Sequence, residues 1–156
     1  MKFRMNFGIV KTIILAVIVA GALAIIGVDI AMLAGENTAE PAIAGVSVGV
    51  AALIAVAALL VLLNSYYNFK DDRLVTVLGF FVDKIDYKDI VCVKQNSETR
   101  EIYLITKGVK QTDGDISFKV NISTQKVDGF IAALRDKIGD IIVEVYTPEK
   151  KDKNKK

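Results

Sequence analysis

The chain has 156 residues, of which 53% are hydrophobic and 24% are charged, and its formal net charge is +2. It has no histidine, the commonest general base and metal ligand, and its one cysteine leaves no intramolecular disulfide. Charged residues are absent from residues 12–28 and 41–63, so the sequence excludes an ordinary soluble enzyme, a disordered chain and a disulfide-stapled secreted domain.

Two apolar stretches near the N-terminus predict membrane-spanning helices. The first runs from about residue 9 to 34 if Asp29 lies near the far membrane interface, and it ends at Val28 if this charge stays outside. The second, residues 42–63, is about 33 Å of helix, which matches the roughly 30 Å hydrocarbon core of a bilayer. Because the linker between them is short, we expect antiparallel neighbours, a transmembrane hairpin within residues 1–65.

Basic residues at the outer ends of the two spans predict the orientation of the hairpin. They are Lys2, Arg4 and Lys11 before the first span, and Lys70 and Arg73 after the second. The positive-inside rule therefore predicts a protein that crosses the plasma membrane twice, with both termini in the cytoplasm. The competing interpretation is a signal peptide cleaved near residues 20–24, which would put the C-terminal part outside the cell.

Small residues recur every four positions in both spans and are candidates for helix packing, because they let helix backbones approach closely in lipid. The candidate positions are Ala16, Ala20 and Ala24 in the first span, Gly45 and Gly49 in the second, and Ser47, Ala51 and Ala55 on another face of the second. Two interpretations stay open: Gly45 and Gly49 pack the hairpin against itself, which we prefer, or they hold together a homodimer.

Two further groups of residues are candidates for lipid contact. Tyr66 and Tyr67 follow the second span, where an aromatic belt is expected at the membrane interface. The tail, residues 147–156, is rich in lysine and is either solvated and disordered or attracted to anionic lipid. The lysines concerned are Lys150, Lys151, Lys153, Lys155 and Lys156.

Residues 66–146 change to short strand-like segments with turn residues between them. Alternating apolar residues at 116–122 indicate a half-buried strand, and apolar residues at helical spacing over 127–138 indicate an amphipathic helix. The other predicted strands lie at 67–70, 74–78, 80–85, 90–93 and 102–106, with a last one at 141–145. The predicted fold class is α+β, an antiparallel sheet or small barrel closed by the C-terminal helix.

Several of these residues form a familiar pattern. It comprises Tyr67-x-Phe69-x-Asp71-x-x-Leu74, Gly79, Ile85-Asp86-Tyr87-x-Asp89-Ile90, and Val120-Asn121-Ile122-Ser123 before a helix with Phe130 and Leu134 on its inner face. This pattern, over roughly residues 66–138, resembles the membrane-anchored bacterial pleckstrin-homology-like (PH-like) domains, and among them the branch that contains the sublancin immunity protein. The resemblance implies a cytosol-facing PH-like fold without catalysis, and it does not imply phosphoinositide binding.

The residues offer little for catalysis. Cys92 lies between two valines of a strand, where we expect a small buried side chain, and no glycine-rich phosphate loop is found. We therefore predict no enzyme activity, cofactor, metal site or nucleic-acid partner. The predicted function is a non-enzymatic binding or regulatory module at the bilayer that contacts a membrane protein, a lipid or a peptide. Bacteriocin immunity is its concrete version, by resemblance alone, and the alternative is a structural or assembly subunit that packs through its hairpin.

Overall fold

The computed structural model describes residues 1–34, 41–108 and 114–147, and it divides into two compact units. We call residues 7–66 with 77–82 the hairpin unit. We call residues 1–6, 67–76 and those from 83 onward the head unit. The fold class is α+β, as predicted, with two long apolar helices followed by two sheets.

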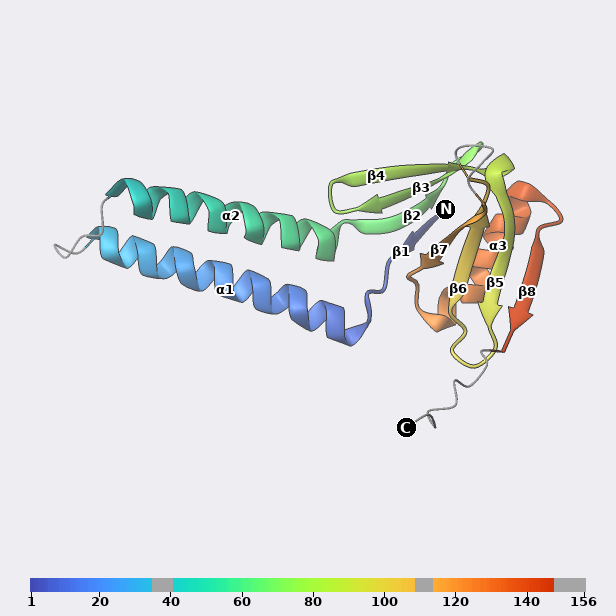
Figure 1. Ribbon diagram of the computed structural model, residues 1–156, viewed down its shortest axis with the longest axis horizontal. Helices are drawn as coiled ribbons and strands as arrows, with labels where there is room; N and C mark the ends of the chain where they lie inside the picture. The colour runs from blue at the N-terminus through green and yellow to red at the C-terminus, as the bar shows by residue number, and fades with distance from the viewer. Residues whose placement is uncertain (35–40, 109–113, 148–156) are drawn as a thin grey trace. The chain divides into compact units, whose positions relative to one another are not determined.

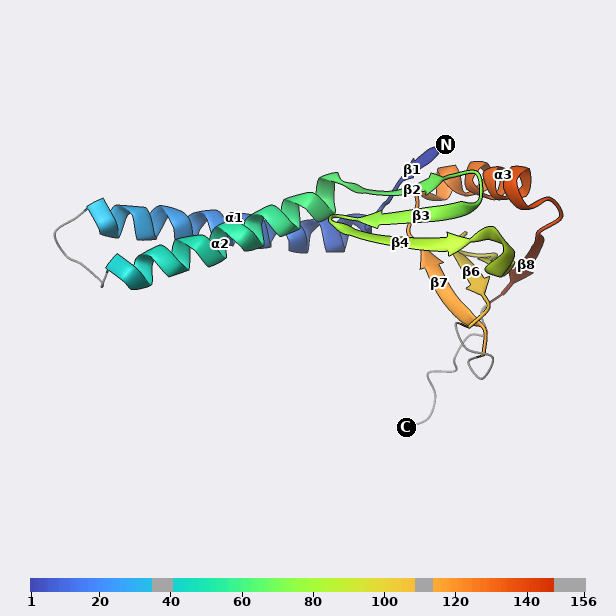
Figure 2. The same ribbon diagram turned by 90° about the horizontal axis from the view of Figure 1, so that it is seen from above.

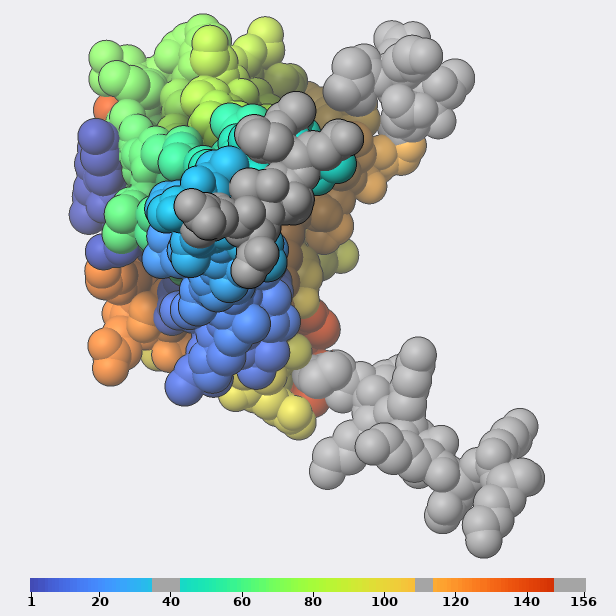
Figure 3. All heavy atoms as spheres, turned by 90° about the vertical axis from the view of Figure 1, so that its left-hand side faces the viewer, coloured from blue at the N-terminus to red at the C-terminus, as the bar shows by residue number. Residues whose placement is uncertain are grey.

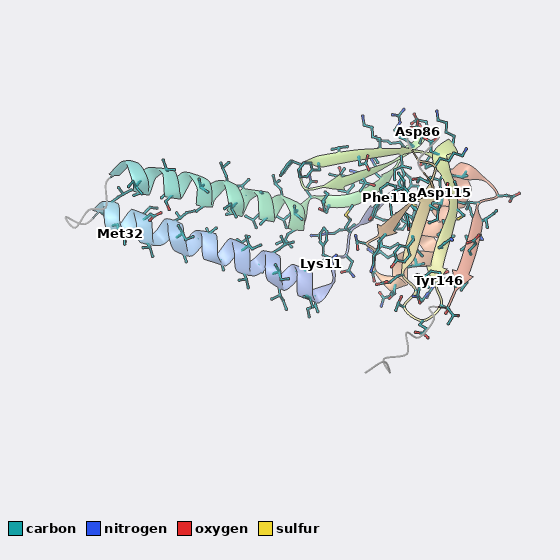
Figure 4. The ribbon with its side chains drawn as sticks, in the orientation of Figure 1. Lys11, Met32, Asp86, Asp115, Phe118 and Tyr146 are labelled. Atoms are coloured by element: carbon teal, nitrogen blue, oxygen red, sulfur yellow. The ribbon has the colours of Figure 1, made fainter. Side chains whose placement is uncertain are left out.

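The hairpin unit consists mainly of α1 (Gly8–Ala34) and α2 (Pro41–Leu63), which lie side by side and run in opposite directions (Figures 1 and 2). Both helices are long and apolar enough to cross a membrane. α1 passes through Asp29 without interruption and ends at Ala34, so the helix itself extends to the longer of the two predicted bounds. In Figure 4, Lys11 and Met32 mark the two ends of α1.

Alanine side chains form the contact between the two helices. Ala22 of α1 and Ala51 and Ala55 of α2 are buried together, and Ile26 packs against them. The large aliphatic side chains point away from this contact and are exposed, among them Ile9 and Leu53. Seen from the hairpin end in Figure 3, the atoms of α1 (blue) and α2 (teal) lie directly against each other. Close backbone approach through small residues is the usual packing mode of helices in lipid.

The strands form two separate four-stranded sheets. The first has the order β1-β2-β3-β4 and the second β7-β6-β5-β8. The strands of the first sheet are β1 (Lys2–Arg4), β2 (Ser65–Phe69), β3 (Arg73–Leu78) and β4 (Phe81–Asp86). Those of the second are β5 (Ile90–Asn96), β6 (Ile102–Thr106), β7 (Ile116–Val120) and β8 (Ile142–Tyr146). The sheets do not close into a barrel, so that part of the prediction is wrong, because alternation along a strand fixes its faces but not its neighbours.

One strand pair also departs from the antiparallel prediction. β5 pairs antiparallel with β6, and β6 with β7, but β8 pairs parallel with β5. The helix α3 (Val127–Ile138) lies between β7 and β8 in the chain and across one face of the second sheet (Figures 1 and 2). A helical crossover of this kind is what allows a strand to return parallel to a sheet.

The core of the head unit is built around Phe130, which is fully buried on α3. Three aromatic rings meet it edge to face, with centroid distances of 5.4 Å to Phe3, 5.6 Å to Tyr67 and 5.1 Å to Phe69. The short strand β1, which the sequence pattern did not predict, brings Phe3 into this cluster. Backbone hydrogen bonds hold it there: Phe69 N–H donates to Met1 O at 2.9 Å. The N-terminal residues therefore fold with the head unit.

The aromatic cluster predicts a large difference between two phenylalanine truncations. Phe130→Ala removes a fully buried ring and should cost the head unit about 3–5 kcal/mol of unfolding free energy. Phe118→Ala, the matched control on β7, removes a ring that is 39% exposed and should cost at most about 1 kcal/mol. The measurement is urea unfolding of the detergent-solubilised chain, followed by labelling of the buried Cys92 thiol. Equal unfolding midpoints for the two variants would contradict the central role of Phe130.

Candidate binding surfaces

A groove runs beside α3 in the head unit and has a volume of about 420 Å³. One wall is a single face of α3, because positions 128, 131, 132 and 135 follow helical spacing. The other wall comes from β5 and β8 of the second sheet. The lining residues are Gln95, Asp128, Ile131, Ala132, Arg135 and Val143.

The groove combines an apolar floor with a few polar groups. Ile131 is buried and Val143 is half-buried, whereas Arg135 is exposed. Asp128 already binds Arg100, whose Nη2 lies 2.6 Å from the Asp128 carboxylate. The guanidinium of Arg135 has no ion pair among the described residues. A groove with this mixed lining and an exposed arginine has the chemistry to accept a peptide segment.

A second, shallower groove of about 200 Å³ lies on the other face of the second sheet. Its lining residues come from four neighbouring strands and are Lys94, Tyr103, Ser117 and Tyr146. The edge strand β8 carries an exposed apolar side chain on each face of the sheet, Ile142 on this face and Val145 on the opposite one. Figure 4 labels Phe118 on β7 and Tyr146 on β8, the two edge strands of this sheet. An edge strand with exposed apolar residues is a template for pairing with an extended peptide.

Charged pairs surround this second groove. Lys119 Nζ lies 2.6 Å from Glu101 Oε1, and Tyr103 donates its hydroxyl to Glu101 Oε2 at 3.3 Å. The hydrogen bond from Lys119 is the main cause that lowers the pKa of Glu101, whereas burial raises the pKa of Tyr103. Lys94 pairs with Glu144 at 3.4 Å on the neighbouring strand. The Lys119 pair favours the ionised form of Glu101, and both pairs place opposite charges side by side on this face.

The predicted helix-packing residues lie outside the contact between α1 and α2. Ala16, Ala20 and Ala24 are exposed, and so are Gly45 and Gly49. A methyl group at either glycine would meet no neighbouring segment of the described chain within 4 Å. The preferred interpretation, that Gly45 and Gly49 pack the hairpin against itself, therefore does not hold. The face with Ala51 and Ala55, which the same spacing pointed out, makes that contact instead.

The predicted lipid-contact residues have different positions. Tyr66 is half-buried, but Tyr67 is only 5% exposed, and its hydroxyl accepts the backbone N–H of Asn121 at 3.0 Å. Tyr67 is thus a core residue of the head unit rather than a lipid contact, because β2 begins before it and alternation turns its ring inward. The lysines at positions 150–156 lie outside the described residues.

Two other residues singled out in the sequence can be located. Cys92 is buried, as expected, and burial is the main cause that raises the pKa of its thiol. Asp29 is half-buried on α1, and its Oδ2 has no hydrogen-bond partner among the described residues. A raised thiol pKa disfavours the nucleophilic thiolate of Cys92, and Asp29 lines an apolar hollow of about 290 Å³ together with Ala24, Ile25 and Val28.

Sequence reasoning did not find the groove-lining residues as a set. Asp128, Ala132 and Arg135 share the polar side of an amphipathic helix, which in the sequence indicates only a solvated face. Gln95 and Val143 join them because β8 pairs with β5, a pairing that the sequence does not encode locally.

Comparison with protein-family models finds no match, and comparison with curated proteins finds none either. The resemblance to PH-like domains therefore stays a prediction.

The Glu101–Lys119 pair predicts a pH-dependent contribution to stability. Because the folded-state pKa of Glu101 is lowered, the contribution is present above the unfolded-state pKa of about 4.3 and is lost as the pH falls through the folded-state pKa. The two side chains are 43% and 39% exposed, so the pair is worth at most about 1 kcal/mol. Lys119→Met should remove that amount at pH 7, raise the pKa of Glu101, and make no difference to stability in strong acid.

Carboxyl NMR titration of Glu101, with urea unfolding at pH 7, measures both effects. Lys94→Met is the matched control, since Lys94 pairs with Glu144 instead, and it should leave the pKa of Glu101 unchanged. A pKa of Glu101 that stays the same in the Lys119→Met protein would show that another group lowers it.

Proposed function

We propose that the chain is a membrane-anchored, non-enzymatic, PH-like binding or regulatory module on the cytoplasmic face of a bacterial membrane. The observation that supports anchoring most strongly is the distribution of side chains on α1 and α2, which is the opposite of that in a water-soluble protein. Ala22, Ala51 and Ala55 face each other across the contact, and most of the large aliphatic residues face outward. Burial of each large aliphatic side chain is worth about 1.5–3 kcal/mol, so this outer surface favours lipid over water.

The path of the chain supports a hairpin that begins and ends on one side of the membrane. Residues 1–6 and residues 67–76 belong to the same head unit, and both helices lie between them in the chain. Because both ends of the helical hairpin enter this one folded unit, the chain must cross the membrane an even number of times between them. The basic residues Lys11, Lys70 and Arg73, near the outer ends of the helices, favour the cytoplasmic side.

The groove beside α3 is the proposed binding site of the head. Its apolar residues and the guanidinium of Arg135, which forms no ion pair with another described residue, suit a peptide or a juxtamembrane protein segment that carries an acidic group. Peptide-bacteriocin immunity is the concrete form of this proposal, and it rests on the resemblance to PH-like immunity proteins. In that form the head engages an incoming peptide, or the membrane protein that the peptide attacks.

A structural or assembly subunit is the second candidate function. It is favoured by the outward position of Gly45 and Gly49, which leaves open space over the backbone of α2. A helix of another membrane protein, or of a second copy, would approach closely at this face. In this role the hairpin itself is the interaction surface.

Cysteine labelling in cells tests the topology. Glu98→Cys, in the exposed turn between β5 and β6, should react with a membrane-impermeant maleimide only after the membrane is permeabilised. The matched variant Asn37→Cys, in the linker between the helices, should react in intact cells. The natural Cys92 does not interfere, because it is buried. Labelling of Glu98→Cys in intact cells would place the head outside and end the proposal.

Charge reversal in the groove tests the binding function. Expression of the chain in a sensitive host should raise the dose of a membrane-active peptide needed for killing, and Arg135→Glu should abolish most of this protection. Lys107→Glu makes the same charge change on an exposed residue outside the groove and should retain protection. Unchanged susceptibility to every membrane-active peptide tried would contradict the immunity form. Protection by Arg135→Glu equal to that of the wild type would exclude the groove.

A further inference from the structure

The β3–β4 turn, by which we mean residues 78–82 with the end of β3 and the start of β4, carries an exposed apolar surface that the proposed function does not use. Phe80, Phe81 and Val82 are 58%, 62% and 57% exposed, and Leu78 before them is 38% exposed. The rings of Phe80 and Phe81 lie 4.3 Å apart between centroids and form one patch. Three successive exposed apolar residues do not fit a strand with one buried face, where every second residue turns inward.

This turn belongs to the hairpin unit and is fastened to the end of α2. Gly79 N–H donates to the Asn64 carbonyl at 3.0 Å, and the Asn64 amide Nδ2 donates back to the Gly79 carbonyl at 2.8 Å. Ser65 strengthens the junction, since its hydroxyl donates to Val61 O at 2.6 Å and accepts from Gly79 N–H at 3.2 Å. The apolar residues of the turn are therefore held at one fixed position.

Gly79 is the residue that permits this close approach. Its φ is +64°, a conformation that residues with a side chain rarely adopt. A Cβ at this position would lie 3.1 Å from Val61 Cγ2 and 3.2 Å from Val61 N, closer than ordinary packing. The turn thus contacts the last helical turn of α2 directly.

The depth of this contact follows from the length of the helix. α2 extends from Pro41 to Leu63, about 35 Å at 1.5 Å per residue, against a hydrocarbon core of roughly 30 Å. Val61 therefore lies near the edge of the hydrocarbon when α2 spans a membrane. Leu60 and Leu63, on either side of it, are exposed and continue the apolar surface of the helix up to the turn.

We propose that the β3–β4 turn, residues 78–82, is a second membrane contact, which inserts Phe80 and Phe81 into the leaflet beside the end of α2. The occupant is the lipid bilayer, because the patch is continuous with the lipid-facing surface of α2 and lies at interfacial depth, where aromatic side chains are enriched. The charged residues Asp83 and Lys84 follow the patch and mark the limit of insertion. This inference rests on the proposed anchoring of the hairpin.

Tryptophan fluorescence tests the insertion, because the chain contains no tryptophan. Full-length Phe81→Trp protein is reconstituted into vesicles of phosphatidylcholine and phosphatidylglycerol, with and without brominated acyl chains. We expect a blue-shifted emission that bromolipid quenches. Phe118→Trp, the control on β7 of the head, should show water-like emission without quenching.

A second variant tests the fastening of the turn. Asn64→Ala removes the side-chain donor to Gly79, so in the Phe81→Trp background it should reduce the quenching and shift the emission to the red. Asn68→Ala, in β2, is the matched control and should leave both unchanged. Equal quenching in the two variants would show that the Asn64 bond does not hold the turn.

Flotation of the same vesicles separates the two proposals. Protein that fails to float would overturn the anchoring itself. Protein that floats, but whose Phe81→Trp emission is water-like and unquenched, would overturn only the insertion. A blue-shifted, unquenched emission, together with a Phe81→Cys disulfide dimer, would also overturn it and assign the patch to a second copy of the chain.

Discussion

The contact between the alanine faces of α1 and α2 decides where most of the larger side chains of these helices lie. Because Ala22, Ala51 and Ala55 occupy the space between the helices, with Ile26 packed against them, most isoleucine, leucine and valine side chains are left outside. In water this arrangement would expose most of the apolar surface that a folded protein normally buries. In lipid the same arrangement is favourable, since the outward side chains meet acyl chains and the small residues allow close backbone packing. The proposed location and function both depend on this constraint.

The head unit is stabilised differently, by an aromatic core whose rings are buried against one another within the protein. The ring of Phe130 contacts aromatic rings of β1 and β2. The first residues of the chain and those that follow α2 therefore share one core. The two ends of the apolar hairpin therefore enter the same folded unit. The groove beside α3 and the edge strands of the second sheet leave this unit with surfaces for a partner, while the β3–β4 turn gives the hairpin unit an apolar surface of its own.

Much of the element order could be predicted, and the misses have physical causes. The helix end at residue 63 follows from a long uncharged stretch, the end at residue 34 was one of two alternatives that Asp29 left open, and α3 follows from its 3.6-residue period. β1 was missed because a strand of three residues with a single buried side chain is too short to show an alternating apolar pattern. The packing face of α2 was assigned to Gly45 and Gly49 because small residues at four-residue spacing occur on two faces, and spacing alone does not say which face meets a partner.

The sequence by itself determined where the chain is apolar, where it alternates and where it turns, because these depend on neighbours within a few positions. Tertiary structure alone decided which strands pair, that β8 joins β5 in parallel, and that the sheets stay open. It also decided that Tyr67 enters the core and that Gln95 and Arg135 line the same groove. Such contacts join residues far apart in the chain, and their geometry follows from packing, which no local pattern contains.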